Sequence, residues 1–163
     1  MPSQYAEGSV PRILIVTAVV AGLAAAVGGH AAGQSGSGLI WATVNSCSPG
    51  SVGVRASLPG DGTSKQMRVR FTAQWYSPAS QGWVPVTGVA ASPWLDAGSA
   101  RYAYGQAGWT FAFDRSGGGR RFLVRARAEM LWLSGGRVVR SAERVTQAGA
   151  VGAGASRATC LIG

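Results

Sequence analysis

The residues that could do chemistry in this chain are few, and their types exclude more functions than they suggest. His30 is the only histidine and Lys65 is the only lysine. Imidazole is the usual proton shuttle near neutral pH and the commonest metal ligand, so a chain that loses His30 loses both functions. A Ser-His-Asp triad then cannot form, and Ser64-Lys65 lies in a Gly/Asp/Ser turn that is most simply a solvated loop. We therefore expect no enzyme activity, no metal site and no cofactor.

The carboxylates outside the N-terminal segment do not form an evident acid/base pair. Each has a simpler place in a turn, at a strand end or beside arginines: Asp61, Asp96, Asp114, Glu129 and Glu143.

His30 belongs to an N-terminal segment that is typical of a secretory signal peptide. Arg12 supplies a positive charge, residues 13–29 carry none, and Gly29-His30-Ala31 places small residues at the −3 and −1 positions of a cut before Ala32. We predict that residues 1–31 are a hydrophobic leader helix, cleaved as a signal peptide. The alternative is an uncleaved membrane anchor, because the segment is about as long as the shortest membrane-spanning helices. Residues 32–38 are rich in Gly, Ser and Gln and predict a flexible linker.

Cys47 and Cys160 are the only cysteines. An even number of cysteines in an exported chain predicts a disulfide. The bond would close a loop of about a hundred residues, for which the chain-entropy model gives ~4–5 kcal/mol. A redox pair or an intermolecular bridge is the alternative, but the spacing fits no redox motif.

The charge is strongly basic, at +9 for the full chain. Fourteen of its fifteen basic residues are arginines, which form bidentate contacts with phosphates and carboxylates. Coding bias toward arginine would give the same composition without any partner. If a partner exists, we expect an anionic envelope polymer, lipid head groups or an acidic protein surface, and we expect no nucleic acid because the protein is exported. Contact with the membrane would come only through an uncleaved leader.

The clearest strand pattern is Met67-Arg68-Val69-Arg70-Phe71-Thr72-Ala73-Gln74-Trp75, in which apolar and polar residues alternate. Period two indicates a half-buried strand. Trp83-Val84-Pro85-Val86 would return after a turn, and Pro85 places it at a sheet edge because proline cannot donate to a ladder.

A long hairpin is expected near the C-terminus, where residues 122–133 and 137–146 flank Ser134-Gly135-Gly136. With the two glycines at the centre of the turn, Leu133 would face Val138 and Trp132 would face Val139. The same register sets Glu129 opposite Ala142. It also leaves Glu143 on the apolar side, so we expect a bulge near that residue.

Weaker strand patterns cover residues 39–44, 51–58, 100–104 and 109–114, and turn signals separate them. Seven to nine short strands with regular turns predict an all-β fold, an antiparallel β-sandwich. We expect one such domain over residues 39–163.

The central strand Phe71-Thr72-Ala73-Gln74-Trp75, with its core tryptophan, and the hairpin of residues 122–146 resemble an immunoglobulin-like or fibronectin type III-like domain of an exported bacterial-type protein. The resemblance covers most of residues 50–146. It implies that the first and last strands run side by side, which would let Cys47 meet Cys160. Cys47 and Cys160 lie outside both ends of the pattern, whereas the disulfide of antibody domains joins strands within it. The position of the disulfide therefore differs from that of the antibody-type family.

Two sets of residues are candidates for binding. The predicted hairpin register places four arginines on one face with only Glu129 to offset them: Arg125, Arg127, Arg140 and Arg144. Trp75 and Trp132 are expected in the core. The aromatic candidates for exposed recognition are instead Trp83, Trp94, Tyr102 and Tyr104.

These features favour an exported, non-catalytic binding or adhesion module of the cell envelope or exterior. The alternative is a membrane-tethered structural or accessory subunit of an envelope protein complex, in which the leader is kept as an anchor.

Overall fold

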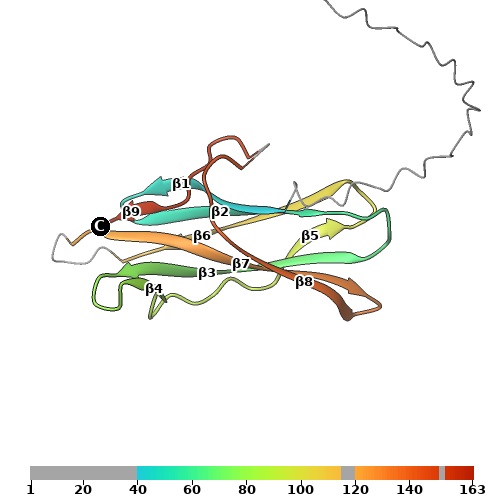
Figure 1. Ribbon diagram of the computed structural model, residues 1–163, viewed down its shortest axis with the longest axis horizontal. Coiled ribbons are helices and arrows are strands. Elements are labelled where there is room, and N and C mark those ends of the chain that lie inside the picture. Colours follow the sequence, from blue (N-terminus) through green and yellow to red (C-terminus); the bar gives the residue numbers. More distant parts are fainter. Residues whose placement is uncertain (1–39, 115–119, 151–152) are drawn as a thin grey trace, which may run out of the picture. The chain divides into compact units, whose positions relative to one another are not determined.

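The computed structural model describes residues 40–114, 120–150 and 153–163. The leader of residues 1–31, including His30, and the linker of residues 32–38 lie outside the described residues. The described part contains nine strands and no helix, and the strands form two antiparallel sheets (Figure 1). The predicted all-β, sandwich-like fold of seven to nine strands is therefore confirmed.

The two sheets differ in size. The smaller has three strands in the order β1-β2-β6: β1 (Trp41–Ser48), β2 (Ser51–Pro59) and β6 (Tyr104–Ala112). The larger has six strands, with β4-β3-β7-β8 as its main path: β3 (Gln66–Ser77), β4 (Gly82–Pro85), β5 (Leu95–Ser99), β7 (Phe122–Ser134), β8 (Arg137–Val145) and β9 (Cys160–Ile162).

The pair β3–β7 is the centre of the larger sheet, with a continuous register from Gln66↔Leu133 to Trp75↔Val124. The outer edge of β3 is divided between β4 and β5, and the outer edge of β7 is divided between β8 and β9. Pro85 lies in β4 at the sheet edge, as its missing N–H predicts.

The core follows the predicted alternation. Met67, Val69 and Phe71 on β3 are fully buried, and so are every second residue of β7 from Val124 to Trp132. The indole of Trp132 donates from Nε1 to the Pro59 carbonyl at 3.0 Å, which satisfies its polar atom inside the core. The expected core position of Trp132 is confirmed, whereas Trp75 is only partly buried.

The β7–β8 hairpin is confirmed, but part of its predicted register is wrong. Gly135 and Gly136 have φ values of 55° and 78°, and Leu133 pairs with Val138 as expected. The register then shifts between Trp132 and Leu133, so Trp132 faces Arg140. This bulge at Val139 lies nearer the turn than the one we expected beside Glu143. It moves Glu143 off the apolar side, because a one-residue shift exchanges the two faces of a strand.

One of the weaker strand expectations is wrong, and one strand was not expected. Residues 100–103 form the turn between β5 and β6, in which the Ala100 carbonyl accepts the amides of Asp61 and Gly62, both at 2.9 Å. The strand β5 had no visible sequence signal. It forms because it pairs with β3 and closes the open edge of that strand.

The chain leaves the larger sheet after β8, crosses to the smaller sheet, and returns as β9. On the way, Gln147 donates to the Ala42 carbonyl at 2.9 Å, and Val44 and Arg157 exchange backbone hydrogen bonds at 2.8 and 2.9 Å. The free edge of β1 is thereby covered. Residues 146–150 and 153–159 are called the crossing segment below.

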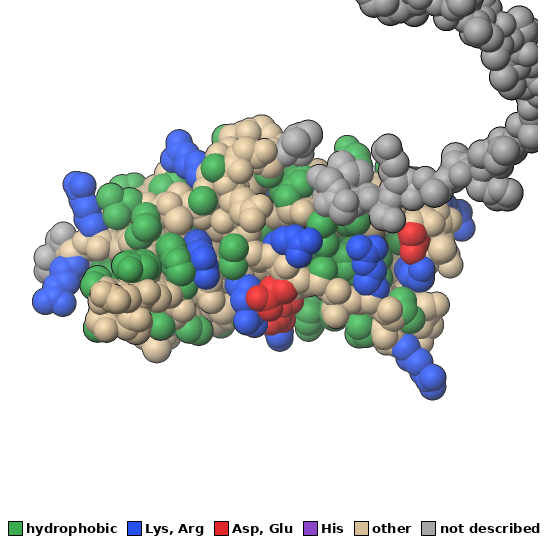
Figure 2. Space-filling model, viewed as in Figure 1, with side chains coloured by type: hydrophobic (Ala, Val, Ile, Leu, Met, Phe, Trp, Pro, Cys, Tyr) green, Lys and Arg blue, Asp and Glu red, His purple; other side chains and the backbone are tan. Residues whose placement is uncertain are grey.

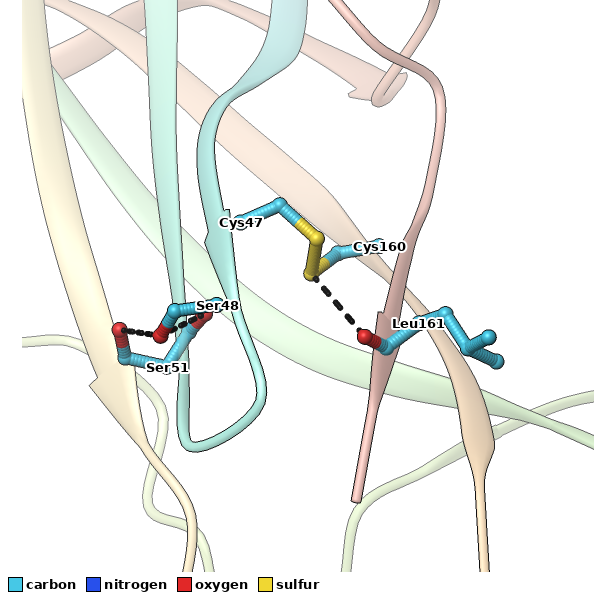
Figure 3. Close-up of a disulfide and its surroundings, with 5 residues drawn as sticks. All are labelled: Cys47, Ser48, Ser51, Cys160 and Leu161. Atoms are coloured by element: carbon cyan, nitrogen blue, oxygen red, sulfur yellow. Dashed lines mark hydrogen bonds between the residues drawn. A yellow bond between two sulfur atoms is a disulfide. The ribbon is translucent and has the colours of Figure 1, made fainter.

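The predicted disulfide is present and ties this return in place. Cys47 of β1 and Cys160 of β9 are bonded, with their Cα atoms 5.5 Å apart and 113 residues between them in sequence. Figure 3 shows the bond between the two strands, with the Leu161 side chain directed away from it. Because β1 and β9 belong to different sheets, the bond joins the sheets to each other.

Replacing Cys160 with serine should lower the free energy of unfolding by about 2–5 kcal/mol, because the unfolded chain regains the freedom that so long a loop had removed. Urea unfolding of the Cys160→Ser, Cys47→Ser and double variants measures this. All three should lose the same amount, since each lacks the one bond. A loss well below 1 kcal/mol, or two thiols that react with Ellman's reagent in the unreduced, denatured wild type, would contradict this role.

Candidate functional site

The candidate site is the face of the larger sheet that is turned away from the smaller sheet, which we call the outer face. Cross-strand partners share a face, so the registers identify its members. They include Arg68, Arg70, Thr72, Gln74 and Tyr76 on β3, Trp83 on β4, Asp96 on β5, Arg125, Arg127, Glu129 and Leu131 on β7, and Ser141, Glu143 and Val145 on β8.

Glu129 is the centre of an ion-pair network on this face. Its Oε2 accepts from Arg70 Nη2 at 2.5 Å, and its Oε1 accepts from Arg127 Nη2 at 2.5 Å. Arg127 also reaches Glu143, with Nη1 3.5 Å from Oε2. Glu129 and Glu143 face each other across β7 and β8, so Arg127 offsets the repulsion between two like charges.

The pKa of Glu129 reflects two opposed effects. Burial raises the pKa of this carboxyl, but the hydrogen bonds from Arg70 and Arg127 lower it further, and the net pKa lies below its usual range. Glu129 is therefore ionised near neutral pH.

Aromatic rings hold two arginines of the outer face. The Arg125 guanidinium lies 4.3 Å from the ring centroid of Trp83, and its Nε donates to Gln74 Oε1 at 2.9 Å. The ring of Tyr76 meets that of Trp83 edge-on at 5.7 Å. Partial burial here lowers the pKa of Arg125.

Trp94 makes the second contact of this kind, because the Arg70 guanidinium lies 4.8 Å from its ring centroid. Beside Trp94 a groove of about 330 Å³ is lined by Leu131, Ser141, Glu129 and Glu143. The aromatic residues Trp83 and Trp94 therefore lie on the same face as Arg125 and Arg127.

The expectation that four arginines share one face is wrong. Arg140 pairs with Trp132 and Arg144 pairs with Ala128, which places both on the opposite side of the sheet from Arg125 and Arg127. Arg140 lies over the ring of Trp132, 4.3 Å from its centroid. The bulge at Val139 is the cause. In Figure 2, basic side chains are spread along the face that is drawn, and the acidic atoms near its middle lie against basic ones.

Tyr102 and Tyr104 are exposed, by 68% and 53%, but they do not join the other candidates. Tyr102 lies in the β5–β6 turn and Tyr104 begins β6 of the smaller sheet. The expectation that both lie on one short strand is corrected by this turn.

Sequence reasoning missed the partners that complete the site, which are Arg70, Gln74 and Tyr76. The alternation in β3 does place Arg70 and Gln74 on its polar face. Their roles depend on the pairing of β3 with β7, which brings Glu129 and Arg125 beside them across 59 and 51 residues of sequence.

Within residues 40–114, 120–150 and 153–163, no group of three or more His, Cys, Asp or Glu side chains could hold a metal ion. No helix in the described part has the length and hydropathy needed to cross a membrane.

Replacing Glu129 with glutamine should lower the free energy of unfolding by about 1 kcal/mol, since the carboxylate pairs with two arginines. The matched Glu143→Gln variant should lose only a few tenths of a kcal/mol, because its one contact is longer and more exposed. Chemical unfolding of both variants at pH 7 compares the two losses. Equal losses in the two variants would contradict the central place of Glu129.

The wild type and the Glu129→Gln variant should also differ in how their stability depends on acid pH. Because folding lowers the pKa of Glu129, its stabilising effect is complete above the unfolded pKa of about 4.3 and is lost as the pH falls through the folded value. The wild type should therefore lose stability more steeply below pH 5 than Glu129→Gln does. Asp61, whose pKa is lowered to about 2 by Lys65 and Thr63, contributes equally to both proteins and cancels from the difference. Parallel pH profiles for the two proteins would refute this.

Comparisons with protein-family models, with curated proteins and with solved structures found no match. The resemblance to immunoglobulin-like and fibronectin type III-like domains therefore stays a prediction from the residues. The two antiparallel sheets and the disulfide are established by the structure itself.

Proposed function

We propose that the chain is an exported, non-catalytic binding or adhesion module of the cell envelope or exterior, which recognises an acidic protein surface through its outer face. The observation that carries the proposal is the pairing of two tryptophan rings, half-buried Trp83 and exposed Trp94, with arginines on one face of the larger sheet. Arg125 stacks on Trp83, and Arg70 stacks on Trp94. Tryptophan, tyrosine and arginine are the side chains most enriched among those that dominate binding energy.

These contacts prepare the arginines for binding. A free arginine side chain loses rotational freedom when a partner immobilises it, and this loss weakens association. A guanidinium that already lies on a ring and donates to a neighbour, as Arg125 does to Gln74, has less freedom left to lose.

The mixture of charges favours a protein over an anionic polymer. The outer face carries four arginines and three carboxylates, those of Asp96, Glu129 and Glu143. A uniformly anionic polymer would be repelled by these carboxylates. A protein surface can set acidic groups against the arginines and a donor against the glutamates, while the net charge of +9 steers an acidic partner toward the chain.

Two further observations support the remaining parts of the proposal. The Cys47–Cys160 disulfide is consistent with a compartment outside the cytoplasm. A catalytic role for the Glu129–Glu143 pair is disfavoured because the lowered pKa of Glu129 makes it a poor proton donor near neutral pH.

Photocrosslinking from the outer face tests the proposal. Benzoylphenylalanine in place of Thr72, at the centre of the face, should give a discrete protein adduct with the envelope fraction of the organism that makes the chain. The matched replacement of Thr110, on β6 of the smaller sheet, should not. Adducts from both positions alike, or binding that survives complete protease digestion of the fraction, would contradict a protein partner on this face.

A charge-matched pair of double variants separates the face from the net charge. Arg68→Gln with Arg125→Gln and Arg140→Gln with Arg144→Gln each remove two positive charges. Only the first pair should weaken binding of the crosslinked partner by tenfold or more, and the binding of the wild type should weaken as salt rises. Equal losses would assign the effect to non-specific attraction and refute the proposed face.

A further inference from the structure

A cavity of about 410 Å³ opens between the two sheets at the end of the molecule that holds the disulfide. The larger sheet supplies Trp75 of β3, Phe122 and Val124 of β7, and Ile162 of β9 to its wall. Phe113, which follows β6, and Pro49, in the turn between β1 and β2, complete the wall on the side of the smaller sheet. Its volume lies within the range of small-molecule sites in proteins, about 300–1,000 Å³.

The aromatic side chains that line this cavity are not fully covered by the rest of the protein. On the inward side of β3, Met67, Val69 and Phe71 are fully buried, whereas Trp75, the last apolar residue on that side, is only partly buried. Phe122 and Phe113 are likewise only partly buried. The sheets therefore leave apolar surface uncovered at this end, and burial of such surface by a ligand is favourable.

The walls are held in place by bonds between elements. Gly163 donates to the Pro49 carbonyl at 3.0 Å, and Phe113 donates to the Gly50 carbonyl at 2.9 Å. The Cys47–Cys160 bond joins the two sheets nearby, and Trp75 meets Phe122 edge-on at 5.7 Å. A cavity with fixed walls binds a ligand without first paying for its own rearrangement.

One charged side chain lines the cavity. Asp114 follows β6 and is exposed, and within the described residues its carboxylate has no hydrogen bond or ion pair. A negative group at an apolar site is notable in a chain of net charge +9. It complements a ligand that carries a positive charge.

We propose that this cavity binds an amphiphilic amine, with the apolar part against Trp75 and Phe122 and the ammonium group against the Asp114 carboxylate. The site is separate from the outer face, because Trp75 and Tyr76 are neighbours in β3 and project to opposite sides of the sheet.

Decylamine and decanoate test the proposal, since they share chain length and differ in the sign of their charge. Each is titrated below its micelle concentration against the full disulfide-bonded protein, with the methyl NMR signals of Val124 and Ile162 as reporters. Decylamine should bind at least tenfold more tightly than decanoate. The net positive charge of the protein would favour decanoate, so the expected preference reports the local carboxylate.

Three variants locate the effect. Asp114→Asn should remove the preference for decylamine. Val89→Phe, which fills the cavity from its wall, should weaken binding of both probes at least tenfold, while Val139→Phe makes the same change on exposed β8 and should leave binding unchanged. Decanoate binding as tightly as decylamine, an Asp114→Asn variant that keeps the preference, or shifts that avoid Val124 and Ile162 would overturn the proposal. None of these results bears on the outer face.

Discussion

The structure depends on how two separate strands share one edge of β7. β8 pairs with the half of β7 nearer the hairpin, and β9 pairs with residues 122–124 at its other end. The chain must leave the larger sheet between the two, and in doing so it covers the free edge of β1. A strand of three residues such as β9 is weak alone. The disulfide to β1 supplies the missing constraint and joins the sheets where the cavity lies.

Because apolar and polar residues alternate along β3 and β7, this pair of strands has an inward apolar face and an outward polar face. Inward residues fill the core and, at one end, line the cavity with Trp75. Outward residues form the network in which Glu129 pairs with Arg70 and Arg127. Arg125 and Arg70 also lie over the rings of Trp83 and Trp94. The high arginine content is therefore not a single basic patch. On the outer face most arginines are held by a carboxylate, an amide or a ring, which makes the face rigid and chemically mixed.

Local sequence patterns predicted the features that depend on neighbouring residues alone. The alternation from Met67 to Trp75 and the Gly135-Gly136 turn led to β3 and to the hairpin. The pairing of the cysteines followed from their number. The bulge at Val139 was missed because a single extra residue leaves no local mark, and that one residue moved Arg140 and Arg144 to the other side of the sheet.

The remaining errors arise from tertiary contacts. β5 has the sequence Leu95-Asp96-Ala97-Gly98-Ser99, which has little β propensity. It is a strand because its backbone pairs with the edge of β3. The expected strand over residues 100–104 became a turn because Ala100 accepts amides from Asp61 and Gly62. The cavity could not be predicted from the sequence, since it depends on the spacing of two sheets and not on any one segment.

Amide hydrogen exchange tests most directly the claim that the disulfide holds the returning chain. In the oxidised protein Val44 of β1 and Arg157 of the crossing segment donate to each other's carbonyls. Gly163, directly after β9, donates to the carbonyl of Pro49, directly after β1. In the Cys160→Ser variant their exchange should accelerate by a much larger factor than that of the β3–β7 ladder, because the crossing segment opens locally while the central pair stays closed. Equal acceleration at all sites, or unchanged protection at Val44, Arg157 and Gly163, would contradict this account.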